Sequence, residues 1–171
     1  MISREQRVTL LLYMIGRLIE KDSWFGETHI QKCIYFLQEF YNVPSGYEYI
    51  LYKHGPFSFE LRDELTAMRA DGLLSLVPRP PYGSSFQYGK TADLWMKKYQ
   101  KEAINYFSLT DKVVDVLAGK KVKELEQLTT ALYVKKRSDN KNIDIMVDEL
   151  ISLKPHIEKE AALHAFMMLD V

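Results

Sequence analysis

Residues 47–77 read YEYILYKHGPFSFELRDELTAMRADGLLSLV and contain two extended segments separated by a helix. Residues 47–53 are rich in tyrosine and branched side chains and precede a His-Gly-Pro turn, which predicts a short strand. Ser58 can then cap a helix with an apolar stripe at helical spacing, and Gly72 supplies its C-terminal signal. The leucine-rich residues 73–77 predict a second strand.

Two amphipathic helices are predicted before this segment. Apolar side chains recur at helical spacing from about residue 4 to residue 21, and again from residue 30 to residue 41. Cys33 lies on the second apolar stripe, so we expect its thiol to face the core.

A β-hairpin is predicted after the third helix. Residues 78–83 contain three prolines and a glycine, which predicts a loop, and residues 86–90 again look extended. The order helix, helix, strand, helix, strand, loop, strand is that of a winged helix. In that arrangement the third helix packs on the first two, and the hairpin is the wing.

The rest of the chain is predicted to be helical, with breaks at residues 105–110, at Gly119 and at Lys154-Pro155. We therefore expect a mainly α (α+β) fold in a single domain over residues 1–171. Its winged-helix-like unit covers about residues 1–91, and a C-terminal helical layer over about residues 92–171 packs on that unit.

Composition favours a folded protein of a reducing compartment. The 171 residues are 47% hydrophobic and 27% charged, far from the composition of disordered chains. Lysine plus arginine and aspartate plus glutamate both number 23, so the overall field does not attract nucleic acid. The single cysteine cannot form an internal disulfide, and the apolar residues 8–15 are too few to span a bilayer. We expect a cytoplasmic protein without a membrane segment.

Four short motifs occur in a distinctive order. Residues 30–35 read IQKCIY, residues 52–56 read YKHGP, residues 126–133 read EQLTTALY and residues 153–156 read LKPH. In this order and spacing they resemble the Panacea domain of SocA-like antitoxins and the related YwgA-like proteins. That family has an x-Leu-Gln-Lys-x-x-Tyr helix and a Tyr-Gly-Pro turn, and His54 stands here in place of the tyrosine. The length and the C-terminal pattern favour the YwgA-like group.

The resemblance implies a small prokaryotic protein that acts by binding another protein. The partner is often a toxin that it neutralises; otherwise the protein is a regulator with an unknown partner. The family has no agreed catalytic residues, so the resemblance implies neither an enzyme nor a cofactor.

Tyrosine is frequent in the predicted strand, the wing and the helix that follows. Core filling explains most of these rings, but strand alternation sends some outward, where aromatic side chains make adaptable protein-binding surfaces. A second copy of the chain could use the same surface, so a homodimer is an open alternative. The candidate partner-binding residues are Tyr49, Tyr52, His54, Phe57, Tyr82, Phe86 and Tyr88.

A DNA-binding regulator is the alternative function, because winged helices commonly place the third helix in the major groove. Over residues 57–72, however, the four acidic side chains outnumber the two arginines. Groove entry needs basic or amide side chains facing the bases. The lysine clusters elsewhere are typical of solvated surfaces, so we expect a protein partner rather than DNA.

No residue pattern indicates catalysis or metal binding. The four histidines lack the spacings of metal sites, and His164 lies on the apolar stripe of the last helix, where we expect a core residue. His29 and Cys33 share a helix face, but burial would make the thiol inert. We predict no catalytic residue, no metal and no cofactor, and place an enzyme behind both binding functions.

Overall fold

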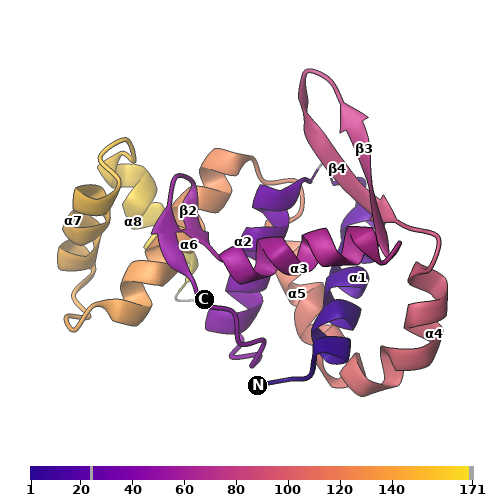
Figure 1. Ribbon diagram of the computed structural model, residues 1–171. Coiled ribbons are helices and arrows are strands. Elements are labelled where there is room, and N and C mark those ends of the chain that lie inside the picture. The colour runs from indigo at the N-terminus through magenta and orange to yellow at the C-terminus, as the bar shows by residue number, and fades with distance from the viewer. Residues whose placement is uncertain (24, 170–171) are drawn as a thin grey trace.

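The computed structural model describes residues 1–23 and 25–169, and the side chain of Tyr82 also lies outside the described part. The fold is mainly helical, as predicted, and contains two small antiparallel hairpins, of which the second is the predicted wing (Figure 1). The elements, in chain order, are α1 (Arg4–Glu20), α2 (Glu27–Glu39), β1 (Ile50–Tyr52), β2 (Gly55–Phe57), α3 (Phe59–Ala70), β3 (Leu74–Arg79), β4 (Tyr82–Tyr88), α4 (Ala92–Ala103), the short 3₁₀ helix η1 (Ile104–Tyr106), α5 (Phe107–Leu117), α6 (Val122–Arg137), α7 (Ile143–Leu153) and α8 (Lys159–Met168).

Helix α2 is the centre of the molecule. It packs against α3, α5, α6 and β2, so nine of its 13 residues are buried, far more than a surface helix allows. Cys33 is fully buried, as predicted. The crowding also buries Lys32 and His29, whose polar atoms must therefore find partners inside the protein.

The strand predicted before α3 is half of a hairpin. β1 pairs with β2 in the register Ile50↔Phe57, Leu51↔Pro56 and Tyr52↔Gly55, so the Gly-Pro pair belongs to a strand and not to the turn. Gly55 has a φ of +86°, a conformation that side chains with a Cβ rarely adopt. That freedom lets the chain reverse after only two connecting residues.

The third helix and the wing follow the predicted order. Ser58 caps α3 by accepting a hydrogen bond from the Leu61 amide at 3.2 Å. The wing strands β3 and β4 extend into the proline-rich segment that was predicted to be a loop. Pro78 is tolerated because the pairing is irregular between Val77 and Arg79, and because each strand of a two-stranded sheet has a free edge.

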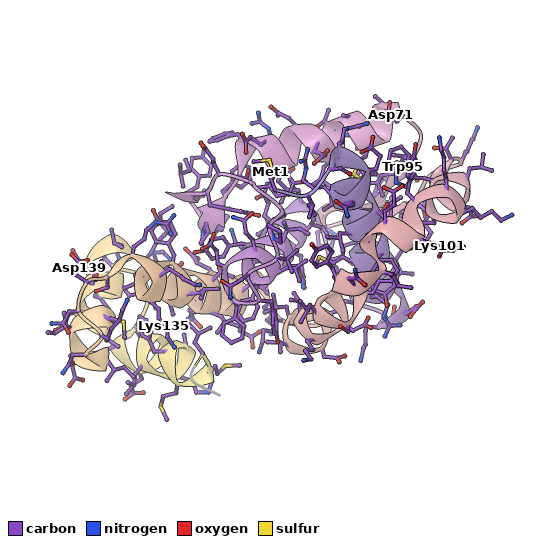
Figure 2. All side chains as sticks on the ribbon, turned by 90° about the horizontal axis from the view of Figure 1, so that it is seen from below. Met1, Asp71, Trp95, Lys101, Lys135 and Asp139 are labelled. Atoms are coloured by element: carbon purple, nitrogen blue, oxygen red, sulfur yellow. The ribbon has the colours of Figure 1, made fainter. Side chains whose placement is uncertain are left out.

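The C-terminal helices pack on this unit from two sides. Helices α4 and α5 contact α1, while α6 contacts α2 and β2 and is covered by α7 and α8. Figure 1 shows α4 and α7 at opposite ends of the molecule, with the wing projecting between them. Figure 2 likewise shows Trp95 and Lys101 at one end and Lys135 and Asp139 at the other.

Glu64 of α3 ties the third helix to α1. Its side chain is only 8% exposed and lies 3.0 Å from Arg7 Nε and 3.5 Å from Arg4 Nε. The Tyr47 hydroxyl donates a further hydrogen bond to the same carboxylate. One acidic side chain therefore fixes α1, α3 and the segment before β1 against one another.

We expect Glu64→Gln to lower the free energy of unfolding by about 2 kcal/mol, because an amide cannot balance the two guanidinium groups. The neighbouring Asp63→Asn is the matched control, since Asp63 is 69% exposed and pairs with Arg62 at the protein surface. Its effect should stay within about 0.5 kcal/mol. Urea unfolding of both variants tests this, and equal losses would contradict the anchoring role of Glu64.

Candidate functional site

Two buried lysines hold the backbone of the β1–β2 hairpin. Lys32 of α2 donates a hydrogen bond to the Pro56 carbonyl at 2.6 Å. Lys154, just after α7, donates to the carbonyls of Tyr52 at 2.6 Å and Lys53 at 2.8 Å. A hairpin whose two strands have only three residues each is not stable on its own. The contacts with the two lysines hold it in position.

Glu126 of α6 supplies the compensating negative charge. It is 5% exposed, and its Oε1 lies 3.2 Å from Lys154 Nζ and 3.2 Å from His156 Nε2. His54 Nδ1, at the hairpin turn, lies 3.9 Å from Oε2. Of the predicted candidates, His54 therefore borders a charged cluster, which we name the lysine–glutamate anchor: Lys32, Glu126 and Lys154.

Burial dominates the electrostatics of Lys32. Removal from water lowers the pKa of its ammonium group from 10.5 to about 8, with Glu126 raising it and Lys154 lowering it further. Lys32 remains mostly protonated at neutral pH and donates to the Pro56 carbonyl. Keeping the charged ammonium group in this buried position therefore costs free energy.

Gly55 lets the hairpin approach α6 closely. A Cβ at this position would lie 3.1 Å from Thr130 Oγ1 and 3.3 Å from Thr129 Oγ1, which is tighter than ordinary packing. Both threonines are buried. The glycine therefore serves two purposes, the positive φ of the turn and the contact with α6.

Sequence reasoning missed the anchor, although its signal was visible. Lys32, Glu126 and Lys154 fall inside three of the four motifs quoted above, IQKCIY, EQLTTALY and LKPH. A lysine on an otherwise apolar helix face is a sign of a buried charge with a specific partner. Lys154 lies 102 and 101 residues from the two carbonyls to which it donates, and Lys32 lies 24 residues from Pro56, so helical periodicity could not connect them.

The outward face of the hairpin carries a group of apolar side chains. Paired and alternate strand residues share a face, which places Ile50, Tyr52 and Phe57 together. Phe59, at the start of α3, joins them: ring centroids are 5.5 Å apart for Tyr52 and Phe57, 5.2 Å for Phe57 and Phe59, and 5.9 Å for Tyr52 and Phe59. We name these four residues the aromatic patch.

The patch is accessible to a partner. Ile50 is 48%, Tyr52 53% and Phe59 43% exposed, while Phe57 is half-buried between the other rings. Single exposed apolar residues are common, but ring contacts join Tyr52, Phe57 and Phe59, and Ile50 pairs with Phe57 on the same face, so the four form a continuous surface.

The structure buries two of the predicted partner-binding residues, Tyr49 and Phe86, contrary to the expectation that they face outward. Tyr49 packs its ring edge-on against Tyr35 at 4.8 Å, and Phe86 lies in the core beneath the wing. Successive residues of an extended segment point to opposite sides, and here Tyr49 points into the core while Ile50 points to solvent.

The wing tyrosines do not form one surface with the patch. Tyr88 is 40% exposed, yet its hydroxyl donates to the Leu12 carbonyl at 3.0 Å and its ring lies over Gly16, so it fastens the wing to α1. Tyr82 opens β4, and its side chain falls outside the described residues. Of the seven candidates, the structure brings Tyr52, His54 and Phe57 together at the first hairpin.

Cys33 and His29, the two residues considered for catalysis from the sequence, are both buried. Burial raises the pKa of the Cys33 thiol, and burial lowers the pKa of His29, whose Nε2 lies 3.0 Å from the Leu117 carbonyl. The prediction for His164 is wrong, because it lies on the exposed side of α8. Among residues 1–23 and 25–169, no group of three or more His, Cys, Asp or Glu side chains is arranged to hold a metal ion.

Charged side chains of α3 lie on different faces of the helix. Glu64 turns toward Arg4 and Arg7 of α1, and Asp71, just beyond the helix, lies 3.1 Å from Arg4 Nη2. Arg62 and Arg69 instead line a groove beside the wing. The net charge of the helix, on which the argument against DNA rested, does not describe this face.

Comparison of the chain with protein-family models and with curated proteins finds no match. Within the described ranges, no helix combines the length and apolar character needed to cross a membrane.

We expect Lys32→Met to change how stability depends on pH. In the unfolded chain Lys32 keeps its proton to about pH 10.5, whereas the folded protein releases it near pH 8. Between these values the unfolded state binds more protons, so Lys32 makes the free energy of unfolding rise with pH, by at most about 1.4 kcal/mol per unit. The variant should lack this rise.

Urea titrations from about pH 7.5 to about pH 10 test the difference between wild type and variant. The exposed Lys101, which Figure 2 shows on α4, gives the control Lys101→Met, and its curve should run parallel to wild type. A parallel curve for Lys32→Met would show that the buried ammonium is not titrating in this window.

Proposed function

We propose that this chain is a non-catalytic, cytoplasmic protein-binding module that presents the aromatic patch to a partner protein. The observation that carries the proposal is the exposure of Ile50, Tyr52 and Phe59 on one side of a hairpin that buried lysines hold in place. The Panacea resemblance adds the partner class: a toxin that the module neutralises, or a protein that it assists as an accessory factor.

The energetics of the patch favour protein binding. Fully burying a large apolar side chain contributes roughly 1.5–3 kcal/mol, so covering the exposed half of three such side chains contributes about 2–4 kcal/mol. Tyrosine and arginine are enriched among residues that dominate binding energy, and Arg62 lies 5.0 Å from the centre of the Phe59 ring. Fixed rings lose little conformational entropy on binding.

The titratable groups support a non-catalytic role. Lys32 donates to Pro56, His29 contacts a backbone carbonyl, and Cys33 is enclosed by apolar side chains. Each satisfies a structural contact within the fold, which leaves binding as the function that the exposed features favour.

We expect the double variant Tyr52→Ala/Phe59→Ala to weaken partner binding at least about 30-fold, as for loss of an interface hot spot. Leu94→Ala is the matched control, because Leu94 is 68% exposed on α4, away from the patch. Tagged wild type and both variants would be incubated with a nuclease-treated extract of the native host. The bound protein would then be purified and its affinity for each measured by calorimetry.

Loss of binding in the double variant but not in Leu94→Ala supports the proposal. A toxin partner would in addition arrest growth when its gene is expressed alone and not when it is expressed with this chain. If sedimentation shows a dimer that only the patch variant dissociates, the patch serves a homodimer instead. Equal binding by all three proteins contradicts the proposal.

A further inference from the structure

A groove of about 940 Å³ lies between α3, the wing, the start of α2 and the α5–α6 connection. Its size is that of a site for a ligand or an extended peptide segment. Leu76 of β3 is 37% exposed and Val122 of α6 is 41% exposed, and these two side chains give the groove an apolar wall.

Basic side chains surround this apolar wall. Arg62 and Arg69 line the groove from α3, and Lys120 and Lys121 line it from the α5–α6 connection. Among the described residues the lining contains one acidic side chain, Glu27, and Arg62 is also paired with Asp63 at 2.9 Å, so the excess of positive charge rests on Arg69, Lys120 and Lys121. The groove therefore favours a ligand with negative charge.

The groove is continuous with the aromatic patch. Arg62 lines the groove, and its guanidinium also lies over the ring of Phe59, which belongs to the patch. A partner seated on the patch reaches the groove by crossing this one side chain.

The shape and lining favour a peptide over nucleic acid. Duplex DNA needs a protruding helix, whereas here the arginine-bearing face of α3 forms the wall of a hollow beside the wing. Single-stranded nucleic acid binds by stacking its bases on exposed rings. Among the described residues, the phenyl rings that line this groove belong to Phe25 and Phe86, which are only 2% and 6% exposed and so offer no stacking face.

We infer that the groove binds an extended acidic segment of the partner protein, with carboxylates against Arg62, Arg69, Lys120 and Lys121 and an aliphatic side chain on Leu76. This inference rests on the proposed function, because it extends the aromatic patch into a second contact with the same partner. The acidic segment supplies charge recognition, and the patch supplies apolar burial.

The test uses a fluorescein-labelled peptide of about twelve residues that repeats glutamate, leucine, aspartate and serine, with a matched peptide that has glutamine and asparagine for the acids. Fluorescence anisotropy with the full chain at about 0.1 M salt should show saturable binding of the acidic peptide, weakening as salt rises. Arg62→Gln and Arg69→Gln should each weaken it about tenfold, the effect of one charge-assisted hydrogen bond.

Two control variants locate the effect. Lys101→Gln removes a cation from α4, outside the groove, and should leave binding unchanged. Leu94→Ala removes an exposed apolar side chain from α4, also outside the groove, and should likewise leave peptide binding unchanged. Peptide binding that depends on the arginines while the patch variants keep the protein partner would support the groove and refute the patch.

Three results would overturn the inference. The first is no saturable binding of the acidic peptide up to about millimolar concentration, where a weak site is still detected. The second is equal binding of the neutral peptide, which would remove charge as the basis of recognition. The third is tighter binding of a labelled oligothymidylate or DNA duplex than of the acidic peptide at the same salt, which would identify the groove as a nucleic-acid site.

Discussion

The arrangement of the molecule depends on how two lysine ammonium groups are kept inside it. Burying an ammonium group costs several kcal/mol unless hydrogen bonds and an opposite charge replace its water. Here the replacements are three backbone carbonyls of the β1–β2 hairpin and the carboxylate of Glu126. The lysine–glutamate anchor thus joins α2, α6, the segment after α7 and a hairpin that is too short to be stable alone.

The anchor also determines which side of the hairpin meets solvent. Gly55 lies against α6, where a Cβ would press on Thr129 and Thr130, and Pro56 beside it is buried. In the strand register Pro56 pairs with Leu51, so Ile50, Tyr52 and Phe57 lie on the opposite face, where Ile50 and Tyr52 are exposed to solvent. The exposed apolar surface therefore follows from a polar interaction inside the protein, and it is held rigidly for the same reason.

The sequence predicted local structure well and long-range polar contacts poorly. Helical periodicity located α1, α2 and α3, the cap at Ser58 and the burial of Cys33, because each depends on neighbours within a few residues. The roles of Lys32 and Glu126 depend on partners from distant segments, and no local pattern encodes those pairings. Tyr49 shows the same limit, since alternation indicates that one of two neighbours is buried but not which one.

Helix α3 shows why a net charge is a weak guide to function. Of its acidic residues, Glu64 pairs with the arginines of α1 and Asp63 pairs with Arg62, whereas Arg62 and Arg69 line the groove on the other side of the helix. The same helix is thus acidic toward the core and basic toward a possible ligand. Because Arg62 contacts both the groove and Phe59, the helix links the two candidate contacts of the molecule. A winged-helix-like arrangement here gives a concave surface suited to a chain that lies along it, which is a different geometry from the protruding helix of a DNA reader.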